Sequence, residues 1–93
     1  MYKRVITPSA KRSLKKSPLK LREELIITTK ILETDPLAGE RLTGGLSFLY
    51  SLHFRHQDVQ YRVAYTIDHN KKLVLIHFTD KRENFYEKLR KLF

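Results

Sequence analysis

The chain contains no cysteine, so its 93 residues can form no disulfide, supply no thiol nucleophile and hold no thiolate zinc site. This absence fits a reducing compartment, and we expect the cytoplasm. The sequence also lacks an apolar run of the roughly 18 to 20 residues that a membrane-spanning helix needs. The basic start at residues 1–4 is not followed by the apolar core of an export signal. We therefore expect neither membrane insertion nor export.

Acidic residues are also scarce. Ten Asp and Glu residues face 19 Lys and Arg residues, which gives a formal net charge of +9. Such a charge favours a polyanionic or acidic partner, but it does not choose among nucleic acid, a membrane surface and an acidic protein. Hydrophobic residues make up 41% of the chain, a globular composition, and the length suffices for one hydrophobic core. We expect a single domain over residues 1–93.

The first half of the chain has helical signals. A short strand ends at Val5-Ile6-Thr7, where Thr7 can cap a helix that begins at Pro8 and turns Ala10 and Leu14 to one face. Ser17-Pro18 repeats the pattern of cap and proline. It precedes an apolar stripe that runs to about Thr34 and consists of Leu21, Leu25 and Leu32, with Ile27 and Ile31 alongside. These segments predict a helical hairpin, followed by a loop over residues 35–45 that contains Pro36 and three glycines.

From Phe48 the apolar period changes to two. Phe48, Tyr50, Leu52 and Phe54 share one face of a predicted strand, and the other face carries Leu49, Ser51, His53 and Arg55. After a polar connection at residues 56–58, residues 61–67 alternate again, and residues 73–78 are apolar on both sides, as in a central strand. Residues 82–93 have helical spacing. The predicted fold class is α+β: an N-terminal strand, a helical hairpin, a three-stranded antiparallel meander and a short C-terminal helix.

Several basic and aromatic side chains can converge in such a sheet. His53, Arg55 and Arg62 come from two neighbouring strands, and Lys81, Arg82 and Tyr86 follow the third. RNA can be cut without a metal ion when a base deprotonates a 2′-hydroxyl, an acid protonates the leaving 5′-oxygen and cations stabilise the phosphate. His53 is the candidate for proton transfer, Arg62 for phosphate binding, and Tyr86 for stacking or proton donation, with Arg82 on the same helix face.

Each of these residues also has a structural interpretation. His53 could be a surface histidine, Arg62 could form a cross-strand salt bridge with Asp58 or Glu83, and Tyr86 could be a half-buried helix aromatic. His77 lies in the most apolar strand and is expected in the core or at its rim. His53 and His56 lack a third ligand, so we expect neither a metal nor another cofactor.

The first acidic residue after the N-terminus is Glu23, and eight cations precede it. Among them, Lys11, Arg12, Lys15 and Lys16 fall on the first predicted helix, where they could bind phosphates of a large RNA. A solvated helix face would explain the same residues.

In this order the motifs resemble those of the RelE/ParE toxin family over nearly the whole chain. The resemblance is carried by Thr7-Pro8-Ser9-Ala10, Asp35-Pro36 with Leu42-Thr43-Gly44, Tyr61-Arg62-Val63-Ala64-Tyr65 and Arg82-Glu83-Asn84-Phe85-Tyr86. It implies a type II toxin that either cleaves messenger RNA on the ribosome or inhibits DNA gyrase. It also implies an antitoxin partner in a hetero-oligomeric complex, with no role for a membrane. A protein-binding toxin without catalysis, or a non-catalytic RNA-binding module, remains the alternative from another class.

In the nuclease branch the resemblance implies active-site roles for Arg62, Arg82 and Tyr86, with basic residues of the preceding strand corresponding to His53 and Arg55. Keeping these residues together favours the nuclease over gyrase inhibition. The chain departs from the lysine-rich members by having Ser51 at a position where they have a basic side chain. His53 could then be the general base, which predicts a dependence of activity on pH around neutrality.

Overall fold

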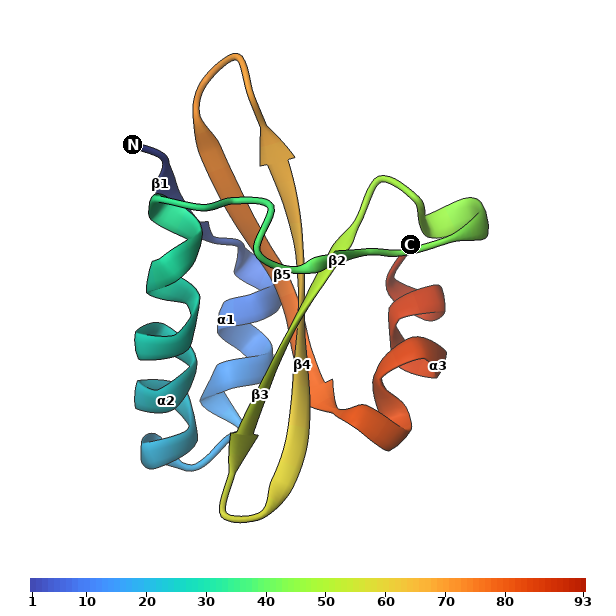
Figure 1. Ribbon diagram of the computed structural model, residues 1–93. Coiled ribbons are helices and arrows are strands. Elements are labelled where there is room, and N and C mark those ends of the chain that lie inside the picture. Colours follow the sequence, from blue (N-terminus) through green and yellow to red (C-terminus); the bar gives the residue numbers. More distant parts are fainter.

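The computed structural model describes all of residues 1–93 as one twisted sheet with helices on both faces (Figure 1). The strands are β1 (Lys3–Ile6), β2 (Glu40–Arg41), β3 (Tyr50–His56), β4 (Val59–Asp68) and β5 (Leu73–Lys81). The α-helices are α1 (Pro8–Lys15), α2 (Leu19–Thr29) and α3 (Arg82–Leu92), with short 3₁₀ helices η1 (Lys30–Glu33) and η2 (Gly44–Leu46). The predicted α+β order is confirmed.

The strand order in the sheet is β1-β5-β4-β3-β2, with β1 parallel to β5 and the other pairs antiparallel. The apolar β5 is therefore an interior strand, as predicted, and β3 to β5 form the predicted meander. The connection between β3 and β4 is a tight turn of two residues, Gln57 and Asp58, both with positive φ. Such a turn matches the twist of the two strands and fixes their register.

The start of α1 follows the prediction. The side-chain oxygen of Thr7 accepts a hydrogen bond from the amide of Ala10, Pro8 is the first helical residue, and Ala10 and Leu14 are buried. The predicted cap at Ser17 is wrong, because its hydroxyl donates to the carbonyl of Ser13 at the end of α1. The second helix begins without a side-chain cap.

The second helical segment departs from the predicted stripe. Leu21, Leu25 and Leu32 are buried, but Ile27 and Ile31 are 68% and 51% exposed. Arg4 of β1 donates to the carbonyl of Ile26 at 2.6 Å, and the amide of Lys30 donates to Ile27. The chain therefore changes from α to 3₁₀ geometry at Lys30, and the regular spacing behind the prediction ends there.

The predicted loop over residues 35–45 contains the two-residue strand β2, which pairs with the start of β3. The hydroxyl of Tyr65 fastens this segment, because it accepts from the amide of Gly39 at 2.9 Å and donates to the carbonyl of Pro36 at 2.8 Å. Burial raises the pKa of Tyr65 to about 12. Tyr65 therefore stays protonated as a structural hydrogen-bond donor at neutral pH.

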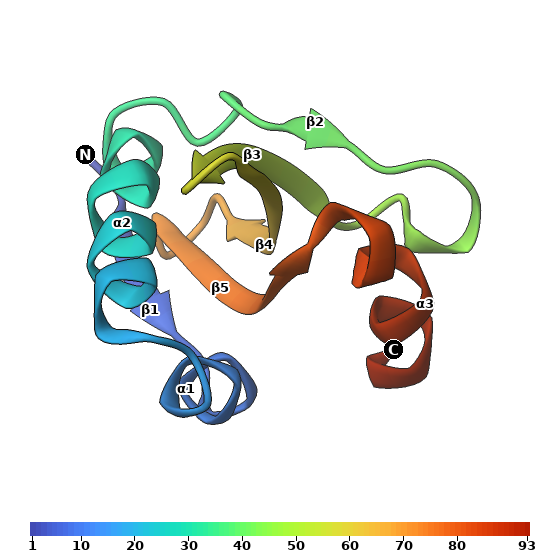
Figure 2. The same ribbon diagram turned by 90° about the horizontal axis from the view of Figure 1, so that it is seen from below.

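The sheet has a hydrophobic core on each face, and Figure 2 shows α1 and α2 on one side and α3 on the other. Beneath α3, Leu42, Leu49 and Ala64 pack with Phe85 and Leu89 of the helix. This layer corrects the prediction for β3, because Leu49 is buried in it, Ser51 is also buried, and only His53 and Arg55 on that face are exposed. Phe48 lies outside the strand and is 49% exposed. None of the helices has the length and apolar character needed to cross a membrane.

Candidate functional site

A cleft of about 690 Å³ lies where the β3–β4 turn, the end of β5 and the start of α3 meet. It is lined by Asp58, Val59, Gln60, Arg62, Lys81, Arg82, Glu83 and Tyr86. The cleft is open, and most of its lining residues are polar or charged. It brings together four of the residues predicted for catalysis or RNA binding: Arg62, Lys81, Arg82 and Tyr86. Its position next to α3 follows from the docking of Phe85 and Leu89, which are fully buried.

The centre of the cleft is a contact between Arg62 of β4 and Tyr86 of α3. The guanidinium Nη1 donates to the Tyr86 hydroxyl at 2.6 Å, and the guanidinium carbon lies 5.3 Å from the ring centroid. Such contacts hold the planar guanidinium in one orientation. The two residues are 24 positions apart in the sequence and meet only because α3 packs on the sheet.

Arg62 has spare donor capacity. Its Nε is buried and has no hydrogen-bond partner, and neither ion pair of the structure involves Arg62. The alternative of a salt bridge with Asp58 or Glu83 is therefore wrong for this structure. The Nη2 group also has no hydrogen-bond partner but is not buried, so it is the donor that an anionic oxygen of a ligand can reach.

Tyr86 presents its hydroxyl to the cleft and its ring to the helix. The residue is 39% exposed, and its ring meets the Phe85 ring edge to face at 5.1 Å between centroids. The predicted alternative of a half-buried aromatic describes the ring, but the hydroxyl faces the guanidinium. The phenol can therefore exchange a proton with a bound ligand.

The remaining two cations of the cleft are exposed. Lys81 is the last residue of β5, and Arg82 begins α3, where its Nη1 donates to the Gln60 side chain at 3.4 Å. Gln60 was not among the predicted site residues. The sequence could have indicated Gln60 through its expected position opposite Arg55 across the β3–β4 turn.

His53 and Arg55 are near the cleft but do not line it. His53 is the direct cross-strand partner of Arg62, so both side chains leave the same face of the sheet. Burial, followed by the charge of Arg62, lowers the pKa of His53 from 6.5, with Glu40 opposing and Arg82 adding to the effect. His53 is therefore mostly neutral at pH 7 and able to accept a proton.

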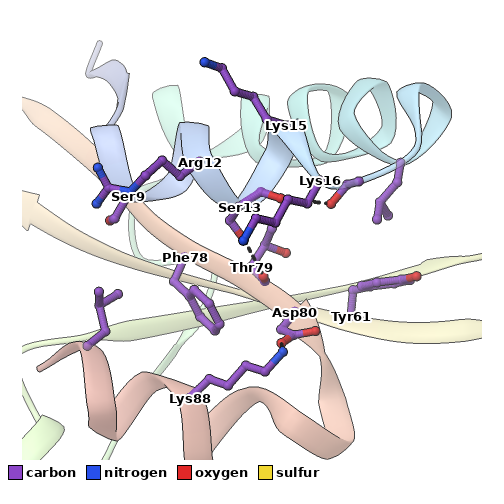
Figure 3. A pocket seen from close by; sticks show the side chains of 13 residues that line it. Ser9, Arg12, Ser13, Lys15, Lys16, Tyr61, Phe78, Thr79, Asp80 and Lys88 are labelled. Carbon is purple, nitrogen blue, oxygen red and sulfur yellow. Dashed lines mark hydrogen bonds and ion pairs between the residues drawn. The ribbon is translucent and has the colours of Figure 1, made fainter.

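The cations of α1 belong to a separate groove of about 610 Å³ along the end of β5 (Figure 3). Arg12 and Lys15 line it from α1, Lys16 lines it just after that helix, and Lys88 lines it from α3. Lys11 is exposed outside this groove. Of the predicted RNA-binding residues, the structure thus places Lys81 in the cleft and Arg12, Lys15 and Lys16 in the groove, whereas Lys11 and Arg55 line neither.

Histidines and carboxylates are scattered through the structure, and no three of them lie together in a way that could hold a metal ion. His77 is half-buried at the rim of the core, as predicted, where its Nε2 lies 2.8 Å from the Thr66 hydroxyl and its ring contacts Phe93. Burial lowers its pKa.

A family model described as the ParE-like toxin of type II bacterial toxin-antitoxin systems matches residues 5–90. The chain belongs to this toxin family. The match confirms the resemblance inferred from the motifs, and the toxin is therefore a component of a type II toxin-antitoxin system. No curated protein matches the chain significantly.

Solved structures similar to the toxin include RelE and RelBE structures. The RelBE2 toxin-antitoxin complex of Mycobacterium tuberculosis contains a chain with 29% identity and a TM-score of 0.75, covering 87% of this toxin and 98% of that chain. A chain of the E. coli RelBE complex shows 20% identity and a TM-score of 0.71, with coverages of 87% and 96%. A doubly substituted E. coli RelE in the free state shows 19% identity and a TM-score of 0.73, with coverages of 99% and 98%. These likenesses confirm the RelE-like fold.

Proposed function

We propose that the toxin is a metal-free endoribonuclease that cleaves messenger RNA on the ribosome and thereby inhibits translation. The observation that carries this proposal is the contact of 2.6 Å between the Arg62 guanidinium and the Tyr86 hydroxyl inside an open cationic cleft. A phosphate-binding cation and a proton donor are thus held together on rigid elements. Preorganised charge of this kind is the largest single contribution in many catalysed reactions.

Arg62 is the proposed phosphate ligand. Its Nη2, which is accessible and has no hydrogen-bond partner, can donate to a non-bridging phosphate oxygen while Nη1 remains with Tyr86. Lys81 and Arg82 at the rim add positive charge along the path of the RNA backbone. The charge that builds on the phosphate during the reaction would be stabilised by Arg62 in particular, because this guanidinium is already fixed and partly desolvated.

The proposed proton transfers use two residues. The 2′-oxygen attacks the adjacent phosphorus and gives its proton to His53. The bond from phosphorus to the 5′-oxygen breaks, and the leaving oxygen receives the proton of the Tyr86 hydroxyl. The products are a 2′,3′-cyclic phosphate and a 5′-hydroxyl end. Each positioned acid or base contributes about 100- to 10,000-fold to such reactions.

His53 is preferred as the base because of what surrounds it. Ser51, two residues earlier on the same face, is buried and does not line the cleft, so that position offers no group to it. The lowered pKa of His53 keeps its imidazole neutral at pH 7. His53 lies outside the cleft lining, so we propose that bound RNA extends over β3 to reach it.

The proposed partners follow from charge. The cations of α1 would bind ribosomal RNA phosphates, and the cytoplasm would be the site of action. An acidic antitoxin would neutralise the basic surface of a chain with net charge +9, which suits the similarity to toxins of the RelBE complexes. Salt should weaken a complex that depends mainly on charge.

Gyrase inhibition, or binding without catalysis, is the second candidate, and it is favoured by the ParE-like description of the matching family. It differs from the nuclease in what the cleft residues do. A protein-binding toxin would keep its toxicity in Arg62→Ala and Tyr86→Phe variants that fold normally.

The test is cleavage of a defined messenger RNA by the purified toxin on programmed ribosomes, followed by analysis of the new ends. We expect 5′-hydroxyl ends that can be labelled by a kinase without prior phosphatase treatment. Arg62→Ala should lower the cleavage rate by about 100- to 1000-fold, the loss typical of one oxyanion-type donor. The matched control is Arg90→Ala, which removes an exposed arginine of α3 outside the cleft lining. Equal losses in both variants would contradict the role given to Arg62.

A further inference from the structure

One carboxylate connects the end of β5 to the second turn of α3. Asp80 Oδ1 accepts from the amide of Lys81 at 2.7 Å, at the residue that precedes the helix. Asp80 Oδ2 accepts from the ammonium of Lys88 at 2.8 Å, and Figure 3 shows Lys88 extending from α3 to this carboxylate. The Asp80 side chain is only 18% exposed. We call Asp80 and Lys88 the α3 clamp.

The clamp adds direction to the apolar contacts of α3. Phe85 and Leu89 bury the apolar side of the helix, but apolar burial is non-directional and tolerates small rotations. Lys81, the N-cap residue of α3, makes no capping hydrogen bond with its side chain. Asp80 provides an acceptor at this end, where a negative charge also matches the helix dipole. The Asp80–Lys88 ion pair thus ties the second turn of α3 to the strand that precedes it.

The position of α3 decides whether the cleft is assembled. Asp80 is the cross-strand partner of Arg62, and α3 carries Tyr86, which must come within hydrogen-bond distance of Arg62. The backbone of Arg62 is held separately, because the Thr79 hydroxyl donates to its carbonyl at 3.0 Å. Arg62 is thus fixed by the sheet, whereas Tyr86 depends on the helix. A shift of about 1 Å in a reacting group can cost about 100-fold in rate.

We propose that Asp80 and Lys88 are positioning residues, which hold α3 so that the Tyr86 hydroxyl meets Arg62 and the scissile phosphate. Neither residue touches the RNA in this role; both act through Tyr86. The inference rests on the proposed nuclease function. The hydrogen bond and charge of Asp80 raise the pKa of Lys88, so the clamp stays ionised at neutral pH. The Lys88 side chain is 55% exposed, and an exposed ion pair adds little to stability, so the main effect of the clamp falls on geometry.

The test uses four single variants of the full chain on programmed ribosomes. Lys88→Ala and Asp80→Asn should lower kcat by about 10- to 100-fold and change KM by less than about threefold. Asn keeps an acceptor for the Lys81 amide, so Asp80→Asn isolates the loss of the ion pair. Lys88→Arg should restore most of the rate, since Arg can also pair with Asp80. Lys91→Ala is the matched control, because Lys91 is an exposed cation of the same helix without an ion pair.

A double variant decides whether Lys88 acts through Tyr86. In a Tyr86→Phe background, Lys88→Ala should cause less than about a twofold further loss, because the group that it positions has been removed. Undiminished loss in that background would overturn the proposal and indicate that Lys88 contacts RNA directly. A loss in Lys91→Ala equal to that in Lys88→Ala, or no rescue by Lys88→Arg, would also overturn it.

A measurement without RNA separates this inference from the proposed function. In the isolated toxin, an NMR cross-peak between the Tyr86 ring and the Arg62 side chain should be present, weaken in Lys88→Ala and persist in Lys91→Ala. An unchanged cross-peak in Lys88→Ala would refute the clamp. If the wild-type toxin cleaves no RNA, the proposed nuclease function fails, and this cross-peak still decides the structural claim.

Discussion

The substitution Tyr86→Phe should separate catalysis from stability. It removes one hydroxyl and keeps the ring that packs on Phe85 and lies beside the Arg62 guanidinium. The residue is 39% exposed, so water can replace the lost partner of Arg62. A hydrogen bond at such a site contributes about 1 kcal/mol or less to folding. For a domain of this size that corresponds to a fall in Tm of less than about 8 °C.

The cleavage rate should fall much further. A proton donor contributes about 100- to 10,000-fold, equivalent to about 3 to 5 kcal/mol of transition-state stabilisation. The assay is single-turnover cleavage of messenger RNA on saturating ribosomes, beside a thermal unfolding scan of the same preparation. Tyr86→Ala is the comparison, because it also removes the ring and should lower Tm further. The assignment would be refuted by Tyr86→Phe cleaving at more than about a tenth of the wild-type rate.

Four further predictions concern pH, the core and the groove. The cleavage rate should be constant above pH 7 and should decrease as the pH drops below 6.5, the ordinary pKa of histidine. The reason is that the pKa of His53 is lowered from this value and that the neutral imidazole acts as the base. The pH–rate profile of the His53→Gln variant should lack this decrease. His77 also has a lowered pKa in the folded state, so protonation favours the unfolded chain, and the free energy of unfolding should decline as the pH falls below 6.5. Chemical denaturation should show a smaller decline in the His77→Gln variant than in the wild-type toxin. Phe85→Ala should destabilise the fold by about 3 to 5 kcal/mol in urea unfolding, because the ring is fully buried between α3 and the sheet. Neutralising Arg12, Lys15 and Lys16 together should weaken ribosome binding and flatten its salt dependence, while cleavage by ribosome-bound toxin stays unchanged; an unaltered salt slope would contradict RNA contact at the groove.

The order of elements could be predicted because local signals and tertiary packing agree along most of the chain. Thr7 and Pro8 mark the start of α1, and the apolar run of residues 73–78 identifies an interior strand. The end of α2 could not be predicted, because it depends on Arg4, which reaches a carbonyl from another element. Strand β2 has only two residues and no periodicity. Its place depends on the distant Tyr65 hydroxyl.

The candidate site was predictable in its residue types but not in its grouping. Arg62, Arg82 and Tyr86 were identified from motifs, and the structure brings all three to one cleft. The alternation predicted one chemical face for the segment around β3, but Leu49 and Ser51 are buried, Leu49 in the cluster with Phe85 and Leu89 of α3, so only His53 and Arg55 are exposed there. The ion pair of Asp80 and Lys88 was missed. It joins a strand end to the second turn of a helix, and no sequence spacing predicts such a pair until the position of the helix is known.

The central claim is that the cleft cuts messenger RNA during translation, and primer extension on a message carried through cell-free translation tests it most directly. The comparison needs the wild-type toxin, the Arg62→Ala variant and a control that lacks ribosomes. If the cleft cuts messenger RNA, new cuts should appear only with ribosomes and should disappear with the Arg62→Ala variant. An intact message in the presence of folded wild-type toxin and active ribosomes would contradict it and direct attention to gyrase.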